Sequence, residues 1–180
     1  MTGVALSQTV ALLVSWLVAL IFAAALRHKV QSWARFKASF AAYRLVPERL
    51  VTPVAVVLAG LEGWVVLGCL AGLPAALLTG GGLFFVYGVA MAINLFRGRR
   101  FIDCGCGDEP TPLGAGLLVR NLVLVGLATA AAGGVPDMRS AGLEVLVALL
   151  GAGVAYGIYA AIDQLLANRG LHRRLWLGVS

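Results

Sequence analysis

Long apolar runs separated by short polar segments dominate the pattern of this chain. The run from Val4 to Leu26 has no charged residue, and the run from Leu50 to Phe96 has a single one, Glu62. A helix rises about 1.5 Å per residue, so about 20 apolar residues cross the hydrocarbon core of a bilayer. The first run is therefore long enough for one membrane crossing and the second for two.

Two further runs are weaker candidates for membrane spans. Arg120 interrupts the run from Leu113 to Val135, and Glu144 and Asp163 lie near the ends of the run from Leu143 to Leu166. The glycine- and proline-rich stretch from Gly72 to Gly82 predicts the turn within the second long run. We expect an all-α, polytopic transmembrane helix bundle with four to five spans in one integral membrane domain, residues 1–180. The predicted spans are 4–26, 50–72, 76–96, 113–135 and 143–166.

Composition supports a membrane protein. Charged residues make up 12% of the chain, against about a quarter in a typical soluble domain. The first run has no basic segment before it and is longer than the apolar core of a signal peptide, so we expect it to stay in the mature chain. The net charge of +6 would suit nucleic acid in a soluble protein. Here the distribution of basic residues indicates membrane topology, and no nucleic-acid partner is expected.

The segment from Arg27 to Arg49 mixes basic residues with apolar ones at helical spacing. We predict an amphipathic helix at the membrane interface between the first two spans, with its lysines and arginines toward anionic head groups and Pro47 after its end. Its apolar positions are Val30, Trp33, Phe36, Phe40 and Tyr43.

The basic residues also predict the orientation. All but one of the 14 Lys and Arg residues fall on one side of the predicted spans, and the exception is Arg139. Cytoplasmic loops carry the excess of Lys and Arg. We therefore expect a multi-pass protein of the inner or plasma membrane, with its N-terminus outside and its C-terminus in the cytoplasm. This orientation places Cys104 and Cys106 at the cytoplasmic face, about a membrane thickness from Cys69.

The sequence Asp103-Cys104-Gly105-Cys106 carries the most reactive groups of the chain. A disulfide between two cysteines one residue apart is strained and readily reduced, and Gly105 permits unusual backbone angles. Nearby arginines favour the thiolate, whereas the acidic residues around the pair oppose it. A redox-active pair, half of a metal site and an inert loop stay open as alternatives, although no histidine lies near to complete a metal site.

Glu62 is the other unusual residue, because a charge inside a span marks a position in the bundle interior or a functional one. We predict that Glu62 pairs with Arg120 inside the bundle; the alternative is that Arg120 extends to the cytoplasmic head groups. Asn94 and Asn121 are expected to form hydrogen bonds between helices. Cys69 is expected to be a buried small residue.

Several of these motifs together resemble the MauE family of the wider MauE/DoxX group of redox-associated membrane proteins. The resemblance rests on Ala92 to Arg99, Ile102 to Gly107 and Leu118 to Asn121, with Tyr43 to Pro47 and Glu62 also fitting. It implies a bundle of four or five helices that supports methylamine utilisation through maturation or export of the disulfide-rich small subunit of periplasmic methylamine dehydrogenase. A thioredoxin-like partner, MauD-like, is implied as well.

Carried over to this chain, the resemblance makes Cys104 and Cys106 the redox pair and Glu62, Arg120 and Asn121 supporting intramembrane positions. The leading hypothesis is thiol–disulfide exchange that supports maturation of an exported protein. The alternatives are a non-catalytic scaffold or export factor, and a quinone-linked oxidoreductase in which Glu62 handles protons. The implied client is periplasmic, whereas the charge distribution places Cys104 and Cys106 at the cytoplasmic face. Both can hold if the bundle relays electrons outward. No cofactor other than a quinone is expected.

Overall fold

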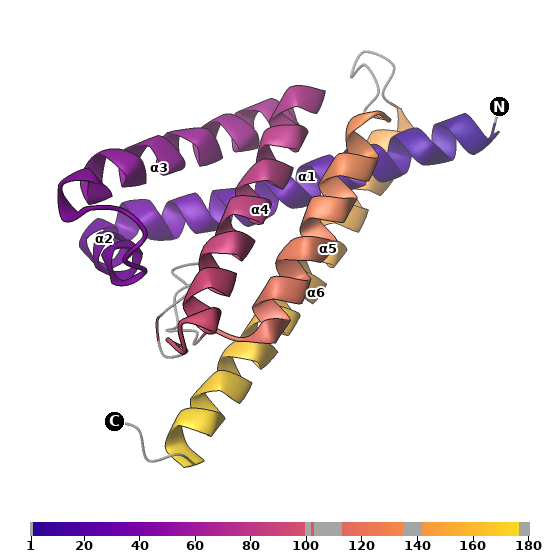
Figure 1. Ribbon diagram of the computed structural model, residues 1–180. Coiled ribbons are helices and arrows are strands. Elements are labelled where there is room, and N and C mark those ends of the chain that lie inside the picture. Colours follow the sequence, from indigo (N-terminus) through magenta and orange to yellow (C-terminus); the bar gives the residue numbers. More distant parts are fainter. Residues whose placement is uncertain (1, 100–101, 103–112, 135–141, 177–180) are drawn as a thin grey trace.

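The computed structural model describes residues 2–99, 102, 113–134 and 142–176, and within this part the chain forms six helices and no strand. Figure 1 shows their arrangement. The helices are α1 (Thr2–Gln31), α2 (Trp33–Ala42), α3 (Glu48–Leu70), α4 (Pro74–Phe96), α5 (Ala115–Ala132) and α6 (Leu143–Trp176).

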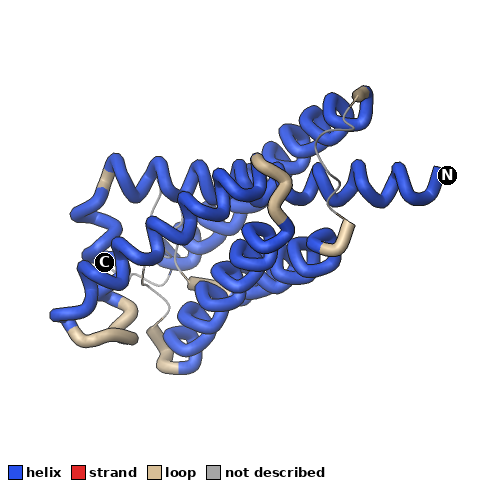
Figure 2. Tube along the Cα trace, turned by 90° about the horizontal axis from the view of Figure 1, so that it is seen from above, coloured by secondary structure: helices blue, strands red, loops and turns tan. Residues whose placement is uncertain are grey.

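Helix α1 is the centre of the bundle. It packs against α3, α5 and α6, while α4 packs against α3 and α5. Of the residues in the apolar stretch of α1, 56% are buried, whereas 11% of those in the apolar stretch of α6 are buried. Helix α6 is therefore a peripheral helix that rests mainly on α1. Figure 1 shows its C-terminal part extending beyond the other helices, and Figure 2 shows the same helices from above.

Five of the helices are long and apolar enough to cross a membrane: α1, α3, α4, α5 and α6. Large apolar side chains on their outer faces are exposed, among them Leu67, Leu122 and Leu150. Such faces match a bilayer, which solvates apolar side chains. The chain is thus a multi-pass membrane protein, and the predicted all-α bundle is confirmed.

The turn within the second long apolar run is shorter than predicted. The turn between α3 and α4 is confined to residues 71–73, where Gly72 has a φ of 72° and Pro74 begins the next helix. Gly80 instead lies inside α4. A Cβ at this position would stand 3.0 Å from Val18 and 3.1 Å from Val65. The lack of a side chain at this position lets α4 approach α1 and α3 closely.

The amphipathic segment is also divided differently. Helix α1 continues to Gln31, so Lys29 belongs to the last turn of a membrane-spanning helix instead of the predicted interfacial helix. The shorter α2 then ends at Ala42, before Arg44, which has a φ of 50°. Pro47 precedes α3 and marks the start of that helix.

Candidate functional site

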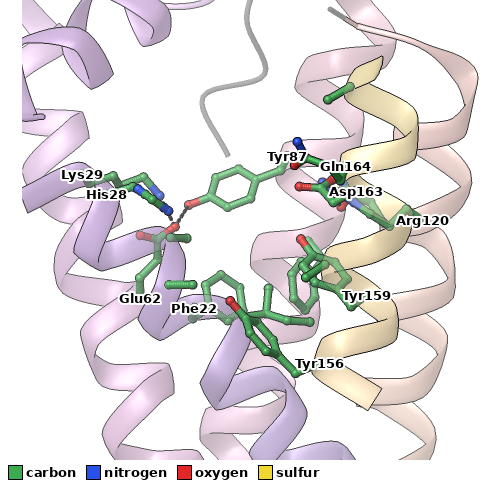
Figure 3. Close-up of a pocket in the computed structure, with 17 residues that line it drawn as sticks. Phe22, His28, Lys29, Glu62, Tyr87, Arg120, Tyr156, Tyr159, Asp163 and Gln164 are labelled. Atoms are coloured by element: carbon green, nitrogen blue, oxygen red, sulfur yellow. Dashed lines mark hydrogen bonds and ion pairs between the residues drawn. The ribbon is translucent and has the colours of Figure 1, made fainter. Parts of the chain in front are cut away.

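A polar cavity of about 220 Å³ lies inside the bundle, between α1, α3, α4, α5 and α6 (Figure 3). This volume is far larger than the space that one water molecule needs. Polar side chains at membrane depth are costly and mark functional positions. The polar lining residues are His28, Lys29, Glu62, Tyr87, Arg120, Asn121, Tyr156, Tyr159, Asp163 and Gln164.

On one side of the cavity, three helices meet at the carboxylate of Glu62. Lys29 of α1 forms an ion pair with Oε1 of Glu62, and the two side chains are 6% and 0% exposed. The hydroxyl of Tyr87 on α4 donates a hydrogen bond of 2.7 Å to the same oxygen. The ammonium group of Lys29 also lies 5.5 Å from the centre of the Tyr87 ring, within the range of a cation–π contact.

The second carboxylate oxygen of Glu62, Oε2, has no hydrogen-bond partner among the described residues, although it is buried. A buried carboxylate oxygen without a partner costs free energy. A donor of another molecule, water or ligand, would remove that cost.

On the other side of the cavity, Arg120 of α5 forms an ion pair with Asp163 of α6. The guanidinium group lies 5.4 Å from the centre of the Tyr159 ring. The amide nitrogen of Asn121 lies 3.9 Å from the sulfur of Met91 and donates to it, which links α5 to α4. These contacts place α6 in the site through Asp163 and Tyr159.

The two ion pairs face each other across the cavity, and aromatic side chains lie between them (Figure 3). The phenol groups of Tyr156 and Tyr159 and the ring of Phe22 form part of the wall. Each charge is matched by an opposite one, so the two pairs carry no net charge. The site can therefore offer hydrogen-bond donors and acceptors at two ends of a partly aromatic space.

The predicted pair of Glu62 with Arg120 is wrong. Both residues line the cavity, but Glu62 pairs with Lys29 and Arg120 pairs with Asp163. The Arg120 side chain is 8% exposed, so it does not extend to the head groups either. Each buried charge instead pairs with an opposite charge on another helix. In a low-dielectric interior a paired charge costs less free energy than an unpaired one.

The two asparagines behave differently from each other. Asn121 makes the expected contact between helices, as described above. Asn94 does not: its amide donates to the carbonyl of Ala90 in the same helix at 3.1 Å, and its oxygen accepts from Arg99 at 3.1 Å. Asn94 thus holds the end of α4. Cys69 is fully buried, as predicted.

Asp103, Cys104 and Cys106 lie outside the described residues. The described residues on either side of segment 103–112 both pack in one place, a cluster of Tyr43, Met91, Leu113 and Leu117 that we call the Tyr43 cluster. Leu113 is a member and Ile102 packs against it. Within the described part of the chain, no group of His, Cys, Asp and Glu residues could hold a metal ion.

A second hollow, of about 240 Å³, lies between α2, α3 and α4, and we call it the α2 groove. Its lining is mostly apolar, with Phe40, Leu58 and Val86 among the residues that form it. It shares Lys29 and Tyr87 with the polar cavity, so the two hollows are adjacent.

The site contains residues that the sequence did not reveal. Lys29 looked like one of several interfacial bases, and Tyr87 sits in a run of apolar residues. A signal was present for α6, where Tyr156, Tyr159 and Asp163 recur at helical spacing and would share one face. Nothing in the sequence indicated which helix this face meets.

Comparisons with known proteins agree on one family. The family profile described as "Methylamine utilisation protein MauE" matches residues 7–136. The "Methylamine utilization protein MauE" of Methylophilus methylotrophus is 36% identical over 165 residues, covering 86% of this chain and 85% of the relative. The protein of that name from Paracoccus denitrificans is 36% identical over 153 residues, 82% of each chain. No solved structure matches the chain.

Proposed function

The chain belongs to the MauE family, and from this premise we propose that it serves methylamine utilisation as a membrane thiol–disulfide exchange protein. In this role Cys104 and Cys106 support the maturation of an exported, disulfide-containing protein. The client that the family suggests is the small subunit of methylamine dehydrogenase. The second partner is a thioredoxin-like protein that exchanges disulfides with the same pair.

The observation that carries the proposal is the Cys-Gly-Cys sequence in a family member whose described residues lie mostly in membrane-spanning helices. The segment with the pair follows α4 and precedes α5, and its described flanks Ile102 and Leu113 both pack at the Tyr43 cluster. Arg99 strengthens this end of α4 with a hydrogen bond of 3.4 Å to the carbonyl of Tyr43. The fold thus provides firm attachment points for the segment on both sides.

The exchange proceeds in two balanced steps. A thiolate of the reduced pair attacks one sulfur of the partner's disulfide, which forms a mixed disulfide and releases one partner thiolate. The second thiol of the attacking pair then displaces the remaining partner sulfur. Two electrons and two protons have passed from one pair to the other, and each side again holds either a dithiol or a disulfide.

The distribution of charge supports an orientation with the C-terminus in the cytoplasm. Described basic residues gather where α1, α4 and α6 end and where α3 begins, including Arg27, Arg97, Arg169 and Arg49. Segment 103–112 follows one of these ends. We therefore place the pair at the cytoplasmic face and propose that the bundle relays electrons between this pair and the exported client.

The test is a double variant, Cys104→Ser with Cys106→Ser, in cells that grow on methylamine. We expect the disulfide-bonded fraction of the client to fall by about tenfold or more, measured by alkylation and gel shift. Cys69→Ala is the matched control, because this cysteine is buried in α3. It should leave maturation unchanged. Full maturation with normal amounts of the double variant would contradict the proposal and favour a non-catalytic scaffold.

A further inference from the structure

The polar cavity and the α2 groove have complementary chemistry and are neighbours. The cavity carries paired charges and phenols, whereas the groove is mostly apolar. Lys29 and Tyr87 line both of them. A ligand that suits both hollows has a polar head and an apolar tail.

The electrostatics of the cavity narrow the class of the head group. Within each ion pair, Lys29–Glu62 and Arg120–Asp163, the two opposite charges cancel. Neither an anionic nor a cationic ligand therefore gains a net attraction. The aromatic wall between the pairs favours a flat ring. A neutral ring with an oxygen at each of two opposite ends would meet one ion pair at each end.

The hydrogen bonds of the Glu62 carboxylate narrow the class of the head group further. Its Oε1 already accepts from Lys29 and Tyr87, and its buried Oε2 has no partner among the described residues. An ionised carboxylate can only accept hydrogen bonds, so the missing partner is a donor. A hydroxyl on the ring supplies that donor, whereas an ether or a carbonyl does not.

We propose that the polar cavity and the α2 groove together form a binding site for a membrane quinol, with its ring between the two ion pairs and its apolar tail in the groove. The hydroxyl at one end of the ring donates to Oε2 of Glu62. The oxygen at the other end faces Arg120 and Asp163. The bilayer is the source of such a molecule, because quinols dissolve in it.

The use of this site in redox chemistry rests on the proposed function. When Cys104 and Cys106 form a disulfide, two electrons and two protons leave the dithiol, and reduction of one quinone to quinol takes up both. The reverse reaction reduces the disulfide and oxidises the quinol. Binding itself needs neither cysteine, so the Cys104→Ser/Cys106→Ser variant should bind as the wild type does.

The test measures binding to purified full-length protein in detergent by anaerobic equilibrium dialysis. The probes are tetramethyl-para-benzohydroquinone, its dimethyl ether, and trimethyl-para-benzohydroquinone with a decyl tail. We expect saturable binding of the hydroquinone and about tenfold weaker binding of the ether, which cannot donate to Glu62. The tailed hydroquinone should bind more tightly than the tail-less one because the groove buries the tail.

Two variants locate the ligand. In Glu62→Gln, the amide oxygen must face the donors Lys29 and Tyr87, so its NH2 group takes the place of Oε2. The preference for hydroquinone over ether should fall to about one. Val86→Trp, at an exposed position on α4 that lines the groove, should weaken binding of the tailed probe about tenfold and spare the tail-less one.

The control is Val123→Trp on α5, which is exposed to a similar degree and lines neither hollow. It should bind all probes as the wild type does. Absence of saturable binding to folded wild-type protein would overturn the proposal. So would saturable binding that Val86→Trp and Val123→Trp affect equally. Neither outcome bears on client maturation, which the cysteine variants test separately.

Discussion

Lys29 and Glu62 form a buried ion pair that joins the last turn of α1 to the interior of α3. The Lys29 side chain is 6% exposed and that of Glu62 is fully buried. An unpaired charge inside the bundle costs free energy, and the ion pair lowers this cost for both residues. The hydroxyl of Tyr87 adds α4 to the same junction.

Removal of both members of this pair should cost less than the sum of the two single removals. We expect Lys29→Met and Glu62→Gln each to destabilise the protein by about 2–4 kcal/mol, and the double variant to cost clearly less than their sum. Unfolding in mixed micelles measures these free energies. The matched cycle combines Glu62→Gln with Arg120→Met, for which we expect a smaller coupling. A larger coupling in that cycle would contradict the pairing described here.

The Arg120–Asp163 pair should matter most for α6, which otherwise rests mainly on α1. We expect Asp163→Asn to lower the free energy of unfolding by about 2 kcal/mol and to increase amide hydrogen exchange in α6 more than in α4. Glu144→Gln is the control, since this acidic residue of the same helix is exposed. Equal effects of the two substitutions would argue against a specific role for the pair.

Two glycines of α3 should respond oppositely to alanine. A Cβ at Gly68 would stand 2.3 Å from the Cβ of Ala76, whereas nothing lies within 4 Å of a Cβ at Gly60. We expect Gly68→Ala to destabilise the α3–α4 hairpin by about 1–3 kcal/mol through overpacking. Gly60→Ala should be neutral or stabilise the protein by up to about 1 kcal/mol. Thermal unfolding in detergent compares the two directly.

Thiol labelling tests the proposed orientation. In intact cells, a membrane-impermeant maleimide should leave Cys104 and Cys106 unlabelled, and lysis followed by reduction should expose both to the reagent. Cys69 should resist labelling until the protein unfolds, because its side chain is fully buried. Labelling of the pair from outside would reverse the orientation and allow direct exchange with a periplasmic partner.

The prediction of helices succeeded where one physical cause dominates. The run around Val14 and Phe22 is apolar for so long that only a membrane helix satisfies its backbone. The prediction failed at Gly80, which resembles a turn residue in the sequence. It lies inside a helix, where close packing against Val18 and Val65 leaves no room for a larger residue.

The prediction of the site was partial for a similar reason. Glu62 and Arg120 stand out because each is a charge within an apolar run, and both do line the cavity. Their partners could not be predicted, because Lys29 resembled an interfacial base and Asp163 lay near the end of one of the two weaker predicted spans. Pairing depends on which faces of the helices meet, and that is set by packing across the whole bundle.

The amino-acid sequence was enough to predict a multi-pass membrane bundle, through the length and apolarity of its runs. It was also enough to identify the family, through matched residues. It also marked Cys104 and Cys106 as the reactive pair to be tested. The tertiary structure alone decided that Lys29 meets Glu62, that Asp163 meets Arg120, and that the two pairs enclose one cavity. A buried charge pairs with an opposite charge that lies close to it, and only the folded chain determines which side chains lie close together.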